Sequence, residues 1–131
     1  MRTILIPAEP SLPLCEIDTE GLDSLQAAVG GYIEALPVPG VQNATAYINE
    51  EGKFDSSLPV NHRATLVWAK HELLYPGDYI VGDLIITGLN NDTGEQIPVP
   101  ADFLPDLPRG RRNPNGDGWI IDAPTTPAEA I

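Results

Sequence analysis

The chain has 131 residues and a formal net charge of −12, from 7 lysines and arginines against 19 aspartates and glutamates. Its length fits one domain with an extension, and its charge repels phosphate backbones and anionic lipid, so direct binding of nucleic acid or of a membrane is not expected. The single cysteine, Cys15, excludes an internal disulfide framework, and no apolar run approaches the roughly 20 residues that cross a bilayer. We therefore expect a cytoplasmic protein.

Two strands and a helix are predicted at the start of the chain. Residues 2–7 read as a strand that ends at Pro7, and alternation over residues 12–18 predicts a second strand. Asp18 or Thr19 is expected to cap the helix that follows, because a short oxygen-bearing side chain can accept a hydrogen bond from the first turn. Apolar residues at helical spacing then form one stripe: Leu22, Leu25, Ala28 and Val29.

A double glycine, Gly30 and Gly31, follows this predicted helix. Gly30 stands where a helix C-cap needs a left-handed residue, which glycine adopts without steric cost. Phosphate-binding glycines instead follow a strand and open a helix, so that the helical N–H groups face the anion. Because the order here is reversed, we interpret the pair as a cap and turn and not as an anion site.

The middle of the chain predicts two more strands and a second helix. The strands are residues 32–38 and 43–49, and Gly52 suits the left-handed position of a tight hairpin turn. Asn61 is expected to cap a helix over residues 62–74, which the Tyr-Pro-Gly sequence after it stops.

The clearest strand is residues 78–88, a β-branched run that we expect to be central in the sheet. A turn then leads to a last short strand at residues 96–100. Residues 1–97 are interpreted as a small α+β domain, a mixed β-sheet with two helices on one face. Residues 98–131 contain 7 of the 14 prolines and are expected to form a Pro/Gly-rich, irregular C-terminal tail.

Four segments in this order carry a resemblance: LQAAVGGYIEAL, YINEEGKF, LPVNHRATL and DYIVGDLIITG. Together they resemble a family of small proteins with a domain of unknown function from actinobacteriophages and actinobacterial plasmids. The resemblance covers about residues 1 to 90. It implies a phage or mobile-element origin and a small α+β domain, and it supplies no catalytic residues.

Two polar residues and one basic cluster have both structural and functional interpretations. Asp83 interrupts an apolar strand, so either Gly82 marks a bend and Asp83 points to solvent, or Asp83 faces Arg63 or a ligand. Asn61 is a helix cap or a ligand-recognition residue. The basic cluster at Arg109, Arg111 and Arg112 either contacts a partner or pairs with the acidic body of the protein.

No arrangement of residues indicates catalysis. His62 and His71 are nine residues apart without a nearby cysteine, which matches no zinc-binding spacing. Cys15 has no basic neighbour in sequence of the kind that activates a nucleophilic thiol. The turn at residues 90–96 lacks the pattern of a calcium loop. We therefore expect no metal, no cofactor and no enzymatic activity.

The leading hypothesis is a phage or mobile-element accessory protein that binds a host protein. Its candidate surface is formed by Tyr32, Glu34, Asn61, Arg63 and Asp83. The first alternative is a nucleotide or small-ligand binder that sequesters its ligand, with Arg63 and the tail arginines on the phosphates. The second is an acidic DNA mimic that blocks a host defence protein. The protein is expected to be a monomer or a homodimer formed through its sheet edge.

Overall fold

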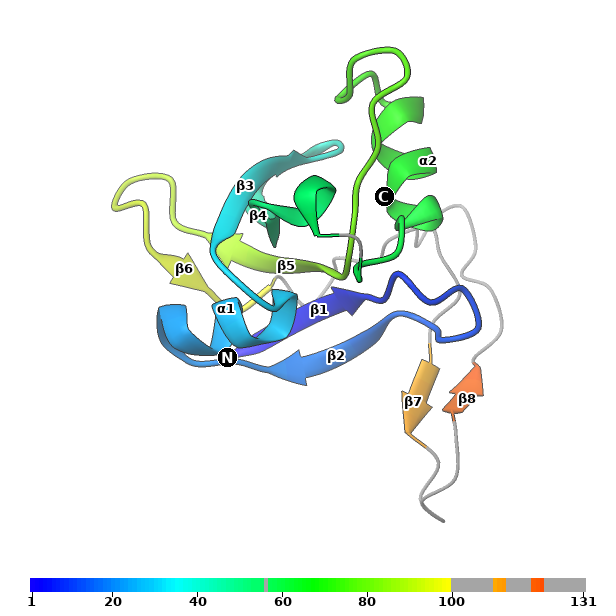
Figure 1. Cartoon of the computed structure of the whole chain (residues 1–131). Coiled ribbons are helices and arrows are strands. Elements are labelled where there is room, and N and C mark those ends of the chain that lie inside the picture. The colour runs from blue at the N-terminus through cyan, green and yellow to red at the C-terminus, as the bar shows by residue number, and fades with distance from the viewer. Residues whose placement is uncertain (56, 100–109, 113–118, 122–131) are drawn as a thin grey trace.

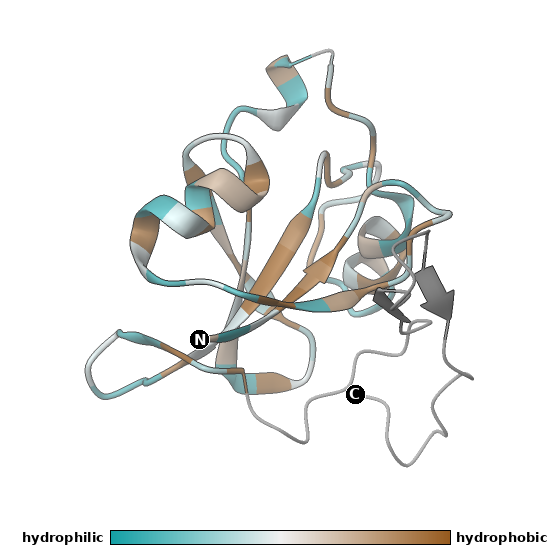
Figure 2. Ribbon diagram, turned by 90° about the horizontal axis from the view of Figure 1, so that it is seen from below, coloured by the Kyte–Doolittle hydropathy of each residue, from teal (hydrophilic) through white to brown (hydrophobic). Residues whose placement is uncertain are grey.

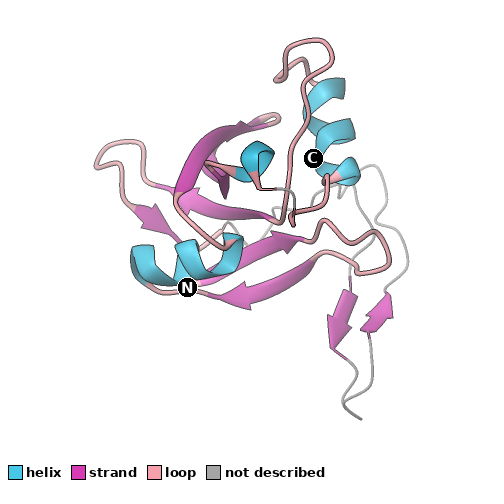
Figure 3. Ribbon diagram, viewed as in Figure 1, coloured by secondary structure: helices cyan, strands magenta, loops and turns pink. Residues whose placement is uncertain are grey.

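The computed structural model describes residues 1–55, 57–99, 110–112 and 119–121. Its elements, in chain order, are β1 (Arg2–Ile6), β2 (Cys15–Asp18), α1 (Gly21–Val29), β3 (Ile33–Val38), β4 (Val41–Asn49), the 3₁₀ helix η1 (Gly52–Phe54), α2 (His62–Lys70), β5 (Leu84–Leu89), β6 (Gln96–Ile97), β7 (Gly110–Arg112) and β8 (Trp119–Ile121) (Figures 1 and 3). Five strands follow the order β2-β1-β5-β4-β3, β6 pairs with the end of β5, and β7 and β8 form a separate pair.

The α+β class is confirmed, but the sheet is antiparallel and not mixed. The pairs β1–β2 and β3–β4 are adjacent in sequence, which makes them antiparallel. Strand β5 lies between β1 and β4 and is antiparallel to both. The long connection from β4 to β5 permits either direction, so the sequence carried no signal for this choice.

The two helices pack on opposite faces of the sheet, so the expectation that both lie on one face is wrong. Leu25 and Val29 of α1 are buried with Ile85 on one face. Ala64 and Trp68 of α2 belong to the core on the other face, with Ile86. Successive strand residues point to opposite faces, and the most hydrophobic ribbon lies in the central strands (Figure 2). A strand that is apolar at every position needs cover on both sides, which one helix per face provides.

Strand β5 is central, as predicted, but it begins at Leu84 and not at residue 78. Before it, Gly82 adopts a φ of 80° and Val81 makes an isolated bridge with Val60. The left-handed glycine bends the chain, which separates residues 78–82 from the strand.

Helix α2 ends at Lys70, four residues before the predicted end. Glu72 takes a φ of 60°, and the N–H of Leu73 donates to the carbonyl of Trp68 at 2.9 Å. These are the features of a left-handed C-terminal cap. By leaving the helix there, the chain packs Leu73 and Leu74 against the α2-side core.

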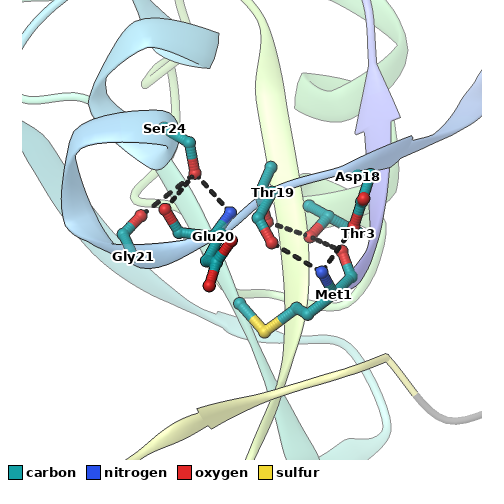
Figure 4. Close-up of polar contacts among 7 residues, drawn as sticks. All are labelled: Met1, Thr3, Asp18, Thr19, Glu20, Gly21 and Ser24. Carbon is teal, nitrogen blue, oxygen red and sulfur yellow. Dashed lines mark hydrogen bonds and ion pairs between the residues drawn. The ribbon is translucent and has the colours of Figure 1, made fainter.

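The start of α1 also differs from the prediction of an Asp18 or Thr19 cap (Figure 4). Asp18 still belongs to β2 and accepts a hydrogen bond from the terminal amine, while the Thr19 hydroxyl lies 2.6 Å from that of Thr3. Glu20 is the N-cap residue, and its own N–H donates to the Ser24 hydroxyl at 2.6 Å. Because Asp18 belongs to β2 and the Thr19 hydroxyl pairs with that of Thr3, neither caps α1, and the helix starts later.

The glycines on either side of the β3–β4 hairpin behave differently. Gly30 is the C-cap of α1, with a φ of 80° and its N–H on the carbonyl of Gln26, as predicted. Gly52 does not take the expected left-handed turn. It begins η1 and is buried, and a Cβ built on it would lie 3.3 Å from Val81. Its small size therefore matters for packing and not for turn geometry.

The tail prediction lies mostly outside the described residues. Within residues 98–131, Val99 is buried in the α2-side core and its N–H donates to the carbonyl of Arg2 at 2.9 Å. Strand β7 contacts β2. Among the helices of the described residues, none combines the length and the apolar character needed to cross a membrane.

Gly88 is the position where a small side chain is most clearly required. A Cβ built on it would lie 2.3 Å from the carbonyl oxygen of Pro98 and 2.9 Å from Ile97. We predict that Gly88→Ala lowers the free energy of unfolding by about 2 kcal/mol, because backbone must move to admit the methyl group. Urea unfolding measures this loss.

Amide hydrogen exchange shows where the strain of Gly88→Ala is released. The Val99 N–H should exchange faster, because the chain after β6 is pushed away from β1. In the control Gly94→Ala, the new Cβ meets nothing within 4 Å, although φ is 76°. Equal exchange of Val99 in both variants contradicts the packing argument.

Candidate functional site

A pocket of about 130 Å³ opens between the β3–β4 hairpin and the segment that leads into β5. Its apolar lining residues are buried or half-buried and form its floor: Leu36 and Ile48 from the hairpin, and Leu74, Ile80 and Val81 from the facing segment. The remaining charged and aromatic lining residues are exposed, or half-buried in the case of Asp78, and form the mouth: Glu34, Glu50, Lys53, Phe54, Asp78 and Tyr79. We call this site the aromatic pocket.

Local hydrogen bonds position η1 at the mouth of the aromatic pocket. Asn49 ends β4 with a buried side chain, which donates to the carbonyl of Val29 at 3.2 Å and accepts from the N–H of Glu51 at 2.8 Å. Gly52 then packs directly against Val81, so η1 lies beside the loop from α2 to β5 (Figure 3). Phe54, the last residue of η1, is thereby held outside the core.

The charged residues at the mouth form a compact arrangement. The Lys53 ammonium forms an ion pair with Asp78 and lies 5.0 Å from the centroid of the Tyr79 ring. The backbone N–H of Tyr79 also donates to Asp78, at 2.8 Å. Hydrogen bonds from Lys53 and from the Tyr79 backbone lower the pKa of the Asp78 carboxyl below its ordinary value. The carboxylate is therefore ionised at neutral pH and holds the lysine over the ring.

Four exposed aromatic residues either line the aromatic pocket or directly neighbour a lining residue. Phe54 is 91% exposed and Tyr79 42% exposed. Tyr75 follows the lining residue Leu74 in sequence and is 85% exposed. The backbone carbonyl of Tyr32 accepts the N–H of the lining residue Glu50, and Tyr32 is 68% exposed. Several aromatic side chains exposed to this extent in one region are typical of a binding surface.

A second cluster joins Asn61, Arg63 and Asp83 near the end of β1. The Asn61 side chain is fully buried, donates to the carbonyls of Ile6 and Gly82 at 3.0 Å each, and accepts from the N–H of Ala64 at 3.1 Å. It is the predicted cap of α2 and also ties the helix to two other segments. Its role in the described structure is to hold the fold together.

Arg63 and Asp83 fix the turn that follows β1. The Arg63 guanidinium donates to the carbonyls of Pro7 and Glu9, and Asp83 accepts the N–H of Ala8 at 2.9 Å. Desolvation is the largest influence on the pKa of Arg63 and lowers it, while the nearby charge of Asp83 acts in the opposite direction. Asp83 is thus half-buried, its carboxylate accepts a backbone N–H, and its charge is near enough to Arg63 to affect the pKa of that residue.

The five predicted binding residues therefore do not form one surface. Glu34 lines the aromatic pocket, and Tyr32 is next to it. Asn61, Arg63 and Asp83 form the separate cluster and do not line the pocket.

The predicted basic cluster is described only in part. Arg111 and Arg112 belong to β7, whereas Arg109 and all three side chains lie outside the described part of the chain.

Sequence reasoning missed Lys53, Phe54, Asp78 and Tyr79. The available signal was a large aromatic residue in each of two glycine-containing turns, EGKF and YPGDY. Connecting segments run over the protein surface, so an aromatic residue in a turn is expected to be exposed. Nothing in the sequence showed that these two turns meet.

Two other features of the described residues bear on ligands. No group of three or more histidine, cysteine or acidic side chains lies close enough to hold a metal ion. A broader hollow of about 630 Å³ lies over the far end of the hairpin, lined by Pro37, Val41, Thr45 and Leu89 among others, and no charged residue lines it. The aromatic pocket is therefore the better candidate for specific recognition, because it combines apolar, aromatic and charged groups.

Comparison with known proteins gives a family and no activity. The sequence model of a family described as Domain of unknown function (DUF3846) matches residues 1–107. No curated protein matches, and no solved structure matches.

Proposed function

The chain belongs to the DUF3846 family, a family of unknown function, and we propose that it acts by binding a host protein through the aromatic pocket, not by catalysis. The observation that carries this proposal is the group of exposed aromatic residues at the pocket, above all Phe54 and Tyr79. Leaving such rings in water is unfavourable, and burying them against a partner is a large source of binding free energy.

The geometry of the aromatic pocket fits a protein interface. Apolar floor residues are surrounded by charged residues at the mouth, which matches the apolar centre and polar rim of known interfaces. The aromatic side chains come from short turns held by hydrogen bonds, so little order has to be gained on binding.

The proposed setting is the host cytoplasm, with the protein as a phage or mobile-element accessory factor. The support is the resemblance of the four sequence segments, which contain Glu34, Lys53, Phe54 and Tyr79.

The pocket is less suited to the nucleotide alternative. Ligand sites for molecules of that size typically enclose about 300–1,000 Å³, and the aromatic pocket encloses about 130 Å³. The broader hollow at the far end of the hairpin reaches about 630 Å³, but its described lining has no charged residue to meet a phosphate. Arg63, which that alternative assigned to phosphate, donates to backbone carbonyls. The host-protein proposal is therefore the one that the geometry supports best.

A pull-down from a nuclease-treated actinobacterial lysate tests the proposal, with the purified chain and its variants as baits and mass spectrometry as the readout. We predict one stoichiometric host protein on the wild-type bait. The double variant Phe54→Ser/Tyr79→Ser should lower its affinity at least tenfold, because two exposed aromatic contacts are removed. Thermal stability should stay unchanged, because neither ring is in the core.

The matched control is Leu22→Ser, an exposed apolar residue on α1, which packs on the opposite face. This variant should retain the host protein. Empty pull-downs from several hosts, or a host protein that the double variant retains in full, would contradict the proposal. Loss of the complex at high salt in every variant, with no effect of the aromatic substitutions, would favour the acidic DNA mimic.

A further inference from the structure

One positively charged side chain of the protein itself, that of Lys53, lies in the aromatic pocket. The Lys53 ammonium lies 5.0 Å from the Tyr79 ring centroid and is paired with Asp78. An aromatic face with a carboxylate beside it is an arrangement that recognises lysine and arginine in many complexes. The local chemistry is thus that of a cation site.

The pair is exposed enough to exchange. The side chains of Lys53 and Asp78 are 46% and 30% exposed. Ion pairs with this degree of exposure are weak, because water solvates both groups well when they separate. Lys53 can therefore leave the ring without a large penalty.

The charge around the pocket favours a second cation over any other group. Glu34, Glu50 and Asp78 contribute three carboxylates to the lining, against the single ammonium of Lys53. An acidic side chain would be repelled, and a purely apolar one would separate the carboxylates from water without replacing their partners. The net charge of −12 further attracts a basic partner.

The shape of the pocket also fits the aliphatic part of a lysine or arginine side chain. Leu36, Leu74 and Val81 give an apolar floor below the acidic mouth. Lysine and arginine have an aliphatic stem that packs on such a surface and a charged head that stays at the rim. A volume of about 130 Å³ admits one side chain of this size.

From these observations, and resting on the proposed function, we propose that the aromatic pocket binds a lysine or arginine side chain from a basic segment of the partner protein. In the free protein, Lys53 takes the position that this side chain would occupy. It lies over Tyr79 and is displaced when the partner binds.

Titration with short peptides tests the proposal, with amide NMR spectra of the full chain as the readout. The probes are acetyl-GRGRG-amide and acetyl-GKGKG-amide, with acetyl-GEGEG-amide as the negative control. The basic peptides should shift the amide signals of Lys53, Phe54 and Tyr79, and the acidic peptide should leave them in place. Asp78→Asn should weaken basic-peptide binding about fivefold or more.

Lys53→Met is the decisive variant, because it removes the competing cation and keeps an apolar chain of similar length. It should tighten basic-peptide binding about fivefold. Lys70→Met, at an exposed position on α2, changes the net charge equally and should have a smaller effect. Likewise, Asp23→Asn on α1 is the charge-matched control for Asp78→Asn.

If Lys53→Met and Lys70→Met change peptide affinity equally, the proposal that the partner displaces Lys53 is wrong. If Asp78→Asn and Asp23→Asn change it equally, the basic peptides bind through general charge attraction and not in the pocket. These results are separable from the proposed function. If a captured host protein depends on Phe54 and Tyr79 while Lys53→Met and Asp78→Asn leave its affinity unchanged, the cation proposal fails and protein binding stands. If the basic peptides bind as predicted and no host protein is captured, the proposed function fails and the cation site stands.

Discussion

Replacing Asn61 with alanine is expected to lower the free energy of unfolding by about 3 kcal/mol or more. The fully buried amide group donates to the carbonyls of Ile6 and Gly82 and accepts the N–H of Ala64. Alanine removes the helix cap and also leaves two buried carbonyls without these donors. An unpaired buried polar group costs its full desolvation free energy, which makes the loss larger than for an exposed cap.

Urea unfolding monitored by circular dichroism measures this effect. Asn61→Asp separates its two parts, because aspartate keeps the cap acceptor and loses both N–H donors. We expect this variant to be destabilised as well, since its carboxylate would face two carbonyl oxygens. Asn43→Ala, at an exposed position of β4, should change stability by less than about 0.5 kcal/mol. A loss below about 1 kcal/mol for Asn61→Ala would show that Asn61 acts as a simple cap.

Trp68→Ala is expected to have the second large effect, a loss of about 4 kcal/mol. Trp68 is 1% exposed and is the largest fully buried side chain of the described residues. Its indole N–H donates to the carbonyl of Pro37 in β3 at 2.8 Å. It therefore fills the core between α2 and the sheet and also fastens the edge strand that carries Glu34 and Leu36 to the pocket.

Trp68→Phe distinguishes packing from the hydrogen bond. It keeps most of the buried ring and removes the donor to Pro37, so a loss of about 1–2 kcal/mol is expected. Its amide NMR spectrum should show changes along β3 that extend to Glu34, because the strand is at the sheet edge and is held on one side. If Trp68→Ala loses less than about 2 kcal/mol, the core must close around the cavity more fully than the burial indicates.

Both stability predictions concern the framework behind the aromatic pocket. Asn61 holds the start of α2 against residue 82, and its N–H donates to the carbonyl of the lining residue Ile80 at 2.8 Å. Trp68 holds the facing strand. The pocket thus lies between two segments that are both tied to α2, which keeps its mouth in a defined geometry without burying the aromatic residues themselves.

The sequence alone determined the elements whose signals are local. Gly30 ends α1 in a left-handed conformation, and Asn61 caps α2 through the N–H of Ala64, as predicted. The β-branched run after residue 83 forms the central strand. Each of these depends on the backbone preference, short-range hydrogen bonding or hydrophobicity of neighbouring residues, and a sequence displays all three directly.

The tertiary structure decided everything that depends on how distant segments pack. The apolar stripes do not specify which face of the sheet each helix covers, and α2 ends early because Leu73 and Leu74 leave the helix for the core. The aromatic pocket exists because η1 packs on Val81 and brings Lys53 to Asp78, 25 residues later in the chain. Contacts between such distant residues are set by the shared core, whose stability comes from burial over many residues and not from any local pattern.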